Sequence, residues 1–211
     1  MRRVLAIMAV LACVFVQAAA ARADDTFDCF SDDIERRIAG CTALIDRGAA
    51  SGMDLSVAYA MRGLAYSLKK EYGNAIPDYD VAIRLNPDFA VALNNRAWAY
   101  YRWGRASQGL ADVERSLFLN PLSPHAFDTR AHIRQSQGDT AGARKDYNEA
   151  MRVGGSRMIR LYQCGLTEQG RYKGEIDGVW RPEVDAALNA CVLDATCDPL
   201  PADEQCRAAT S

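Results

Sequence analysis

The chain has 211 residues, of which 49% are hydrophobic and 25% are charged, a composition typical of a globular protein. Its formal net charge is −2, and the sequence contains neither a basic block nor an acidic block. Because nucleic-acid binding needs a basic surface, no nucleic-acid partner is predicted. The length allows one sizeable hydrophobic core or slightly more than one domain.

Residues 1–23 have the layout of a secretory signal peptide. A short basic start precedes an apolar run from Val4 to Val16, and a small-x-small site ends at Ala23, after which we predict cleavage. Cleavage removes three arginines and no acidic residue, which changes the formal charge from −2 to −5. A lipoprotein site at Cys13 is the alternative, although the bulky Leu11 fits it poorly. No later apolar run reaches the roughly 18 residues of a membrane span.

Export places the cysteines in an oxidising compartment, where an even number argues for disulfide bonds. Six of the seven cysteines remain after removal of the signal peptide, in one group near each end of the chain. Cys29 and Cys41 form the first group and are predicted to pair. A zinc site is disfavoured because no C-x2-C spacing occurs. Three connectivities are open to the second group, which consists of Cys164, Cys191, Cys197 and Cys206.

The segment 24–55 contains one predicted helix, over residues 33–47. Its apolar residues Ile38, Cys41 and Ile45 recur at three- and four-residue steps, the spacing of one helical face. We expect this helix to cover the open end of the helical array that follows, because the ends of stacked repeats need a cap. The predicted disulfide bond would tie the N-terminus to it.

Residues 56–157 repeat with a step of 34 residues. The stretch "RGLAYSLKKEYGNAIPDYDVAIRLNPD" from Arg62 aligns with "RAWAYYRWGRASQGLADVERSLFLNPL" from Arg96, and a third copy begins at Arg130. Proline ends the first two copies, and Gly155 takes its place in the third. An acidic residue recurs in step, as Asp78, Asp112 and Asp146.

This pattern resembles the tetratricopeptide repeat. The small residues that let its two helices approach closely correspond to Gly63, Ala97, Ala131, Ala75, Gly109 and Ala143. The resemblance implies an all-α, tetratricopeptide-type helical-hairpin solenoid with three repeats and an N-terminal capping helix. Local chemistry agrees, since Ser123-Pro124 and Asp139 suit helix starts. The Asn-Pro steps at Asn86 and Asn120 should stop helices.

The resemblance also implies a concave groove, lined by the first helix of each repeat, that binds peptides. Amide side chains can hydrogen-bond a peptide backbone, and aromatic rings bury area at a low entropic cost. The alternative is that these side chains pack against the N-terminal helix or the C-terminal tail. Only Arg102 could act as in the basic carboxylate pocket of the family, so no chaperone-tail clamp is predicted. The groove candidates are Asn94, Asn95, Trp98, Tyr101, Arg102, Asp128, His132 and Gln135.

The sequence contains no catalytic motif and no metal-binding pattern. His125 and His132 lie almost two turns apart on one predicted helix, about 10 Å along its axis, which is too far for one metal ion. We therefore predict a non-enzymatic protein without cofactor or metal.

Residues 158–211 form a predicted C-terminal module with a Cys-rich tail. Its part from Met158 to Cys191 places "GRYKGEIDGVW", residues 170–180, between two predicted helices, the second starting at Pro182. This part resembles the first two-thirds of a small peptidoglycan-binding domain. Arg181 replaces a glycine of that family, and the third helix of the family is missing. The resemblance implies that the peptidoglycan contacts are Tyr172, Asp177, Gly178, Trp180 and Arg181.

The shortened module predicts a disulfide staple. Two helices and a loop bury too little surface to be stable alone. Because Cys164 lies on the first helix and Cys191 on the second, we expect these two to pair, which leaves Cys197 with Cys206.

Together these features predict a periplasmic, non-enzymatic scaffold that binds a protein or peptide partner and is tethered to peptidoglycan by its C-terminal module. The periplasm follows from resemblance to exported repeat proteins of Gram-negative bacteria. Three alternatives stay open. The module could serve only to cap the repeats, the groove could act as a chaperone-like peptide binder, or the protein could be an accessory factor of a cell-wall enzyme.

Overall fold

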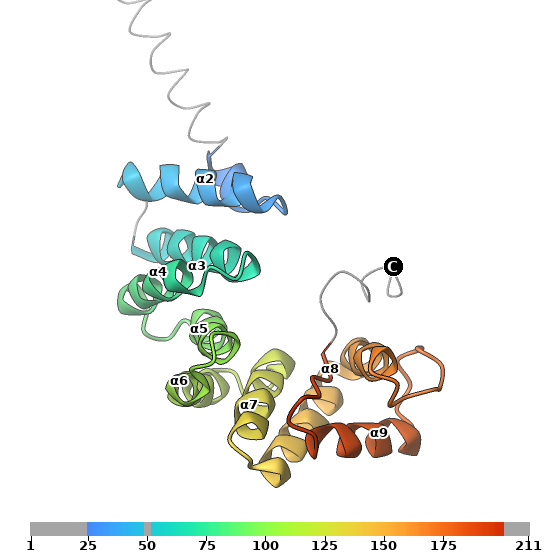
Figure 1. Ribbon diagram of the computed structural model, residues 1–211. Helices are drawn as coiled ribbons and strands as arrows, with labels where there is room; N and C mark the ends of the chain where they lie inside the picture. The colour runs from blue at the N-terminus through green and yellow to red at the C-terminus, as the bar shows by residue number, and fades with distance from the viewer. Residues whose placement is uncertain (1–24, 49–51, 201–211) are drawn as a thin grey trace, which may run out of the picture. The chain divides into compact units, whose positions relative to one another are not determined.

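The computed structural model describes residues 25–48 and 52–200. The predicted signal peptide lies outside these ranges, as do Cys13 and Cys206. Every regular element in the described ranges is a helix, so the predicted all-α fold is confirmed (Figure 1). None of the described helices is both long and apolar enough to cross a membrane. The chain divides into two compact units, and the boundary along the sequence falls between Ala92 and Leu93.

The first unit holds α2 (Ile34–Asp46), α3 (Gly52–Leu68) and α4 (Tyr72–Leu85). Asp33 caps α2, because its carboxylate accepts a hydrogen bond of 2.8 Å from the backbone N–H of Arg36. α2 packs against α3, and α3 packs against α4. The predicted capping helix and the first helical hairpin are therefore both present.

The predicted Cys29–Cys41 disulfide bond is confirmed. Both cysteines are fully buried and share a hydrophobic cluster with Ala58 of α3. The bond closes a loop with a sequence separation of 12. A loop of this size stabilises a fold by about 2–3 kcal/mol in the chain-entropy description.

The second unit contains most of α5 (Ala90–Arg102) and four further helices. These are α6 (Ala106–Leu119), α7 (Pro124–Ser136), α8 (Thr140–Glu168) and α9 (Pro182–Val192). Successive helices from α6 to α9 pack against one another.

The helices begin and end where the local chemistry predicts. The Ser123 hydroxyl accepts a hydrogen bond of 3.2 Å from the Ala126 N–H at the start of α7. The Asp139 carboxylate accepts one of 2.9 Å from the Gly142 N–H at the start of α8. Helices α4 and α6 end at the two Asn-Pro steps, with C-caps at Asn86 and Asn120.

Helix α8 is interrupted at Gly155, which has φ 58° and ψ −149°. This conformation strongly favours glycine, because a side chain with a Cβ atom would clash with the backbone. The interruption divides α8 into a part that completes the third repeat and a part that opens the C-terminal module. Gly155 thus ends the third repeat at the position where proline ends the first two.

An arginine–aspartate pair joins the two helices of each repeat. The arginine Nε and Nη2 atoms donate to the two carboxylate oxygens over 2.7–2.8 Å. This bidentate geometry fixes the angle as well as the distance between the partners. The pairs are Arg62–Asp78, Arg96–Asp112 and Arg130–Asp146.

One hydrophobic core runs from the third repeat into the C-terminal module. It crosses the predicted domain boundary at residue 157, so the module is packed onto the repeat instead of forming a core of its own. Buried members from α7, α8 and α9 include Ala131, Tyr147, Tyr162, Leu166, Val184 and Leu188.

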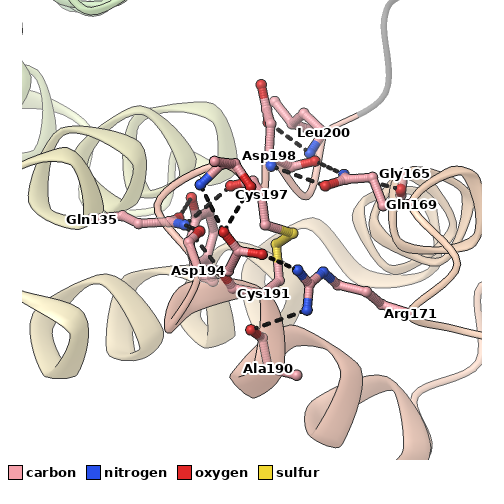
Figure 2. The surroundings of a disulfide bond; sticks show 12 residues. Gln135, Gly165, Gln169, Arg171, Ala190, Cys191, Asp194, Cys197, Asp198 and Leu200 are labelled. Atoms are coloured by element: carbon pink, nitrogen blue, oxygen red, sulfur yellow. Dashed lines mark hydrogen bonds and ion pairs between the residues drawn. A yellow bond between two sulfur atoms is a disulfide. The ribbon is translucent and has the colours of Figure 1, made fainter.

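The predicted staple between Cys164 and Cys191 is wrong, because Cys191 is bonded to Cys197 (Figure 2). Two consecutive turns cause this pairing. The Asp194 N–H donates to the Cys191 carbonyl and the Cys197 N–H donates to the Asp194 carbonyl, each over 3.0 Å. The chain thereby returns to the end of α9, where the two cysteine Cα atoms are 5.2 Å apart. Cys164 is also disulfide-bonded.

The substitution Asp146→Ala should lower the free energy of unfolding of the second unit by roughly 3 kcal/mol, because it removes one partner of a buried ion pair. The Asp146 side chain is 1% exposed and accepts hydrogen bonds from both Arg130 and Arg134. Urea denaturation followed by tryptophan fluorescence measures the change, since the second unit holds Trp98, Trp103 and Trp180.

Asp139→Ala is the matched control, because it removes an exposed carboxylate from the start of the same helix. Loss of a helix cap costs about 1 kcal/mol. Equal losses for the two variants would contradict the importance of the arginine–aspartate pair.

Candidate functional site

The predicted groove residues of α5 share one face of that helix. Asn94, Trp98 and Tyr101 are spaced by four and three residues, which places them above one another. The ring centroids of Trp98 and Tyr101 are 5.2 Å apart. The exposed guanidinium of Arg102 lies 5.4 Å from the Trp98 ring centroid. We call this surface the aromatic face of α5.

Asn94 is 9% exposed, and its side-chain oxygen has no hydrogen-bond partner among the described residues. A buried polar atom without a partner typically costs 1–3 kcal/mol, so a donor from a bound segment would be favourable there. The neighbouring Asn95 is half-buried.

Helix α7 adds His132 to the aromatic face of α5. The imidazole is 1% exposed and makes edge-on contacts with the Trp98 and Tyr147 rings, with centroid distances of 5.2 and 5.1 Å. The Tyr101 ring lies 5.3 Å away. The tertiary structure therefore brings together Trp98, Tyr101 and His132, which the sequence places on two separate repeats.

Both ring nitrogens of His132 are engaged. Nδ1 lies 2.8 Å from the Asp128 carbonyl oxygen, and Nε2 lies 2.9 Å from a carboxylate oxygen of Asp198. Asp198 belongs to the segment that follows the Cys191–Cys197 bond. The chain's own tail therefore contacts this predicted groove residue, as the alternative interpretation expects.

The electrostatics favour a charged imidazole. Burial opposes the charge, but the carboxylates of Asp128 and Asp198 outweigh it and raise the pKa of His132. Burial opposes the charge of Asp198 too, yet its hydrogen bond to His132 lowers the pKa of that carboxyl. Asp128 is fully buried, which raises its pKa, and it accepts a hydrogen bond of 2.6 Å from the Tyr162 hydroxyl. Burial, together with Asp198, raises the pKa of Tyr101 to about 12.

Gln135, the last predicted groove residue, contacts the tail through its side-chain amide. Its Nε2 atom lies 3.1–3.3 Å from three backbone carbonyls, and its Oε1 accepts a 2.8 Å hydrogen bond from the Tyr147 hydroxyl. The carbonyls belong to Cys191, Asp194 and Cys197 (Figure 2). Sequence reasoning missed these tail residues, because "LDATCDPL" has no helical periodicity that would assign it to the groove.

In the C-terminal module, Gln163 holds the predicted Asp177-Gly178 turn. Its buried amide accepts a 2.7 Å hydrogen bond from the Gly178 N–H and donates to the Val179 carbonyl over 3.0 Å. Gly178 has φ 77°, as the turn requires. This explains why glutamine and Asp-Gly occur at this spacing.

Asp177 and Arg181 form an ion pair across this turn. Their two hydrogen bonds measure 2.9 and 2.6 Å. The Arg181 guanidinium keeps the pKa of the Asp177 carboxyl below its usual range. A ligand carboxylate would therefore have to compete with Asp177 for Arg181.

The two predicted aromatic contacts of the module differ in exposure. Tyr172 is 3% exposed and belongs to the hydrophobic core, which removes it from the candidate sugar contacts. Trp180 is 53% exposed. It borders a cavity of about 290 Å³ that the sequence did not predict, lined also by Asn148, Met151, Arg152, Ile159 and Asp185. No cluster of side chains suited to a metal ion occurs in the described part of the chain.

Residues 56–89 match the family model described as the tetratricopeptide repeat. The fold is of the tetratricopeptide-repeat type. The chain is 28% identical over 120 residues to the Hsp70-Hsp90 organizing protein 3 of Arabidopsis thaliana, covering 57% of this chain and 19% of that protein. It is 33% identical over 88 residues to human serine/threonine-protein phosphatase 5, covering 42% of this chain and 18% of that protein.

A third relative is the heat-shock protein cognate co-chaperone sgt12 of Aspergillus fumigatus, which is 29% identical over 123 residues. This match covers 58% of the present chain and 36% of the relative. Because the chain spans well under half of each of these relatives, the similarity supports an interaction module with tetratricopeptide-type repeats and carries no catalytic activity with it.

The stability of the second unit should fall with rising pH because of His132. A raised pKa means that the folded state binds the proton more tightly than the unfolded chain. The imidazolium therefore stabilises the fold below its unfolded pKa of about 6.5, and this contribution is lost as the pH rises through the raised folded pKa. Urea denaturation between about pH 5.5 and 9 should show a smaller loss of stability in His132→Gln than in the wild type.

His125→Gln is the control, since His125 is exposed on the same helix. It should keep the pH dependence of the wild type. An unchanged pH dependence in His132→Gln would refute the proposed protonation.

Proposed function

We propose that this protein is an exported, non-enzymatic scaffold whose tetratricopeptide-type repeats bind an extended segment of a partner protein. The observation that carries the proposal is the aromatic face of α5 together with His132. Polar and aromatic side chains lie together there, beside Asp198 of the chain's own tail. The unpaired amide oxygen of Asn94 on the same face supports it. The names of the relatives, two of which refer to heat-shock proteins, support a protein as the ligand.

Export to the periplasm is part of the proposal. The layout of residues 1–23 supports it. The Cys29–Cys41 and Cys191–Cys197 bonds also support it, because such bonds persist in oxidising compartments.

A photo-crosslinking amino acid at Asn95 tests the groove. Irradiation of cells should join the protein to a partner, because Asn95 is half-buried and precedes Trp98 by three residues on the same side of α5. The added mass is measured by gel shift and mass spectrometry. The same amino acid at Glu114, exposed on α6, is the matched control and should give no such product. Trp98→Ala should abolish the Asn95 product.

Equal crosslinking at Asn95 and Glu114, or a product that survives Trp98→Ala, would rule out binding in the groove. A single product supports a dedicated scaffold. A broad set of unfolded exported chains would instead favour the chaperone-like alternative, and a cell-wall hydrolase would favour the accessory role.

We further propose attachment to peptidoglycan through the C-terminal module. The exposed Trp180 favours this second function, because it borders a cavity lined by the apolar Met151 and Ile159 and by polar side chains. Aromatic rings and flanking polar groups of this kind suit a small amphipathic ligand such as a sugar.

Trp180→Ala should reduce co-sedimentation with purified sacculi while leaving the melting temperature nearly unchanged, since its ring is 53% exposed. Tyr172→Ala is the matched aromatic control. It should lower the free energy of unfolding by about 3 kcal/mol, because it empties a buried site. Wild-type protein that stays in the supernatant would exclude wall attachment.

A further inference from the structure

The chain's own residues 198–200 are held beside His132, with Gln169 contacting the Asp198 backbone. Gln169, at the end of α8, accepts a hydrogen bond of 3.2 Å from the Asp198 N–H and donates to the Asp198 carbonyl (Figure 2). Gln135 of α7 contacts the carbonyls of the preceding loop. Side-chain amides that bind main-chain groups recognise an extended polypeptide irrespective of its side chains.

The side chains of the same residues supply specificity. The Asp198 carboxylate lies 2.9 Å from the buried Nε2 of His132. Pro199 is completely buried, and Leu200 packs against the core of the unit. The site therefore accommodates an aspartate, then a proline, then an apolar residue.

A partner can bind here only if this segment exchanges. Residues 198–200 form no helix, and the Asp198 side chain is 39% exposed. Because no helix has to unfold, local opening of this segment costs less than global unfolding. The Cys191–Cys197 bond keeps the segment close to the groove after opening, so it competes at a high effective concentration.

We propose that this site binds an extended partner segment carrying Asp-Pro followed by an apolar residue, and that residues 198–200 occupy it as an internal competitor. The inference rests on the proposed function, that the groove binds a partner protein. It adds the chemistry of the ligand and the reason why the free protein would bind it only moderately.

The test uses a fluorescein-labelled peptide Ala-Thr-Ser-Asp-Pro-Leu, which is the chain's own sequence with serine for Cys197. Fluorescence anisotropy with the full oxidised protein should give a dissociation constant about tenfold lower for Asp198→Asn than for the wild type, because the internal competitor is weakened. Glu183→Gln removes an exposed acid from α9 and is the matched control, with wild-type affinity. A peptide with asparagine for aspartate should bind every variant weakly.

A second measurement does not depend on any variant. Hydrogen exchange of the wild-type protein should speed up at Asp198 and Leu200 when the peptide is saturating. The Asp198 N–H is bonded to Gln169, and the Leu200 N–H is bonded to the Asp198 carboxylate over 3.0 Å. Displacement of the segment breaks both hydrogen bonds.

Three results of the peptide experiments would overturn the proposal. These are equal affinity of the peptide for wild type and Asp198→Asn, no binding to either, and unchanged exchange at saturating peptide. A dimer that forms with rising concentration in light scattering would show tail exchange between copies and would also overturn it. If crosslinking at Asn95 succeeds while the peptide fails, only this inference fails; if both fail, the proposed function fails as well.

Discussion

Polar side chains in the interior of the third repeat need hydrogen-bond partners, and the C-terminal module supplies them. Asp128 and His132 are almost completely buried, where an unpaired polar group costs 1–3 kcal/mol. Asp128 accepts from the Tyr162 hydroxyl, and His132 binds Asp198, both of which follow the last repeat. The repeat and the module are consequently one packing unit, with a single core across residue 157.

The need of buried polar groups for partners also applies to the ring of His132. A histidine placed among Trp98, Tyr101 and Tyr147 would be costly to charge without a carboxylate beside it. Asp128 and Asp198 provide such carboxylates, and Asp198 does so from the C-terminal tail.

Much of the fold followed from local patterns. The capping helix, the helix ends at the Asn-Pro steps and the caps at Ser123 and Asp139 depend on neighbouring residues, which a linear sequence displays directly. The Cys29–Cys41 pairing followed from counting, because no other cysteine lies near. The pairing of Cys191 failed because it depends on two turns within a short segment, whereas the prediction relied on two helices needing a staple.

The sequence by itself determined the helical repeats, since a 34-residue period carries the small and apolar residues that pair two helices. The same period repeats the arginine and the aspartate of the Arg62–Asp78 pair in each copy. Only the tertiary structure decided that Tyr172 is buried, that Trp180 is exposed and that Asp198 contacts His132. The physical reason is distance along the chain. His132 and Asp198 are separated by 66 residues, and no periodicity links them until the hydrophobic core has folded the module back onto the third repeat.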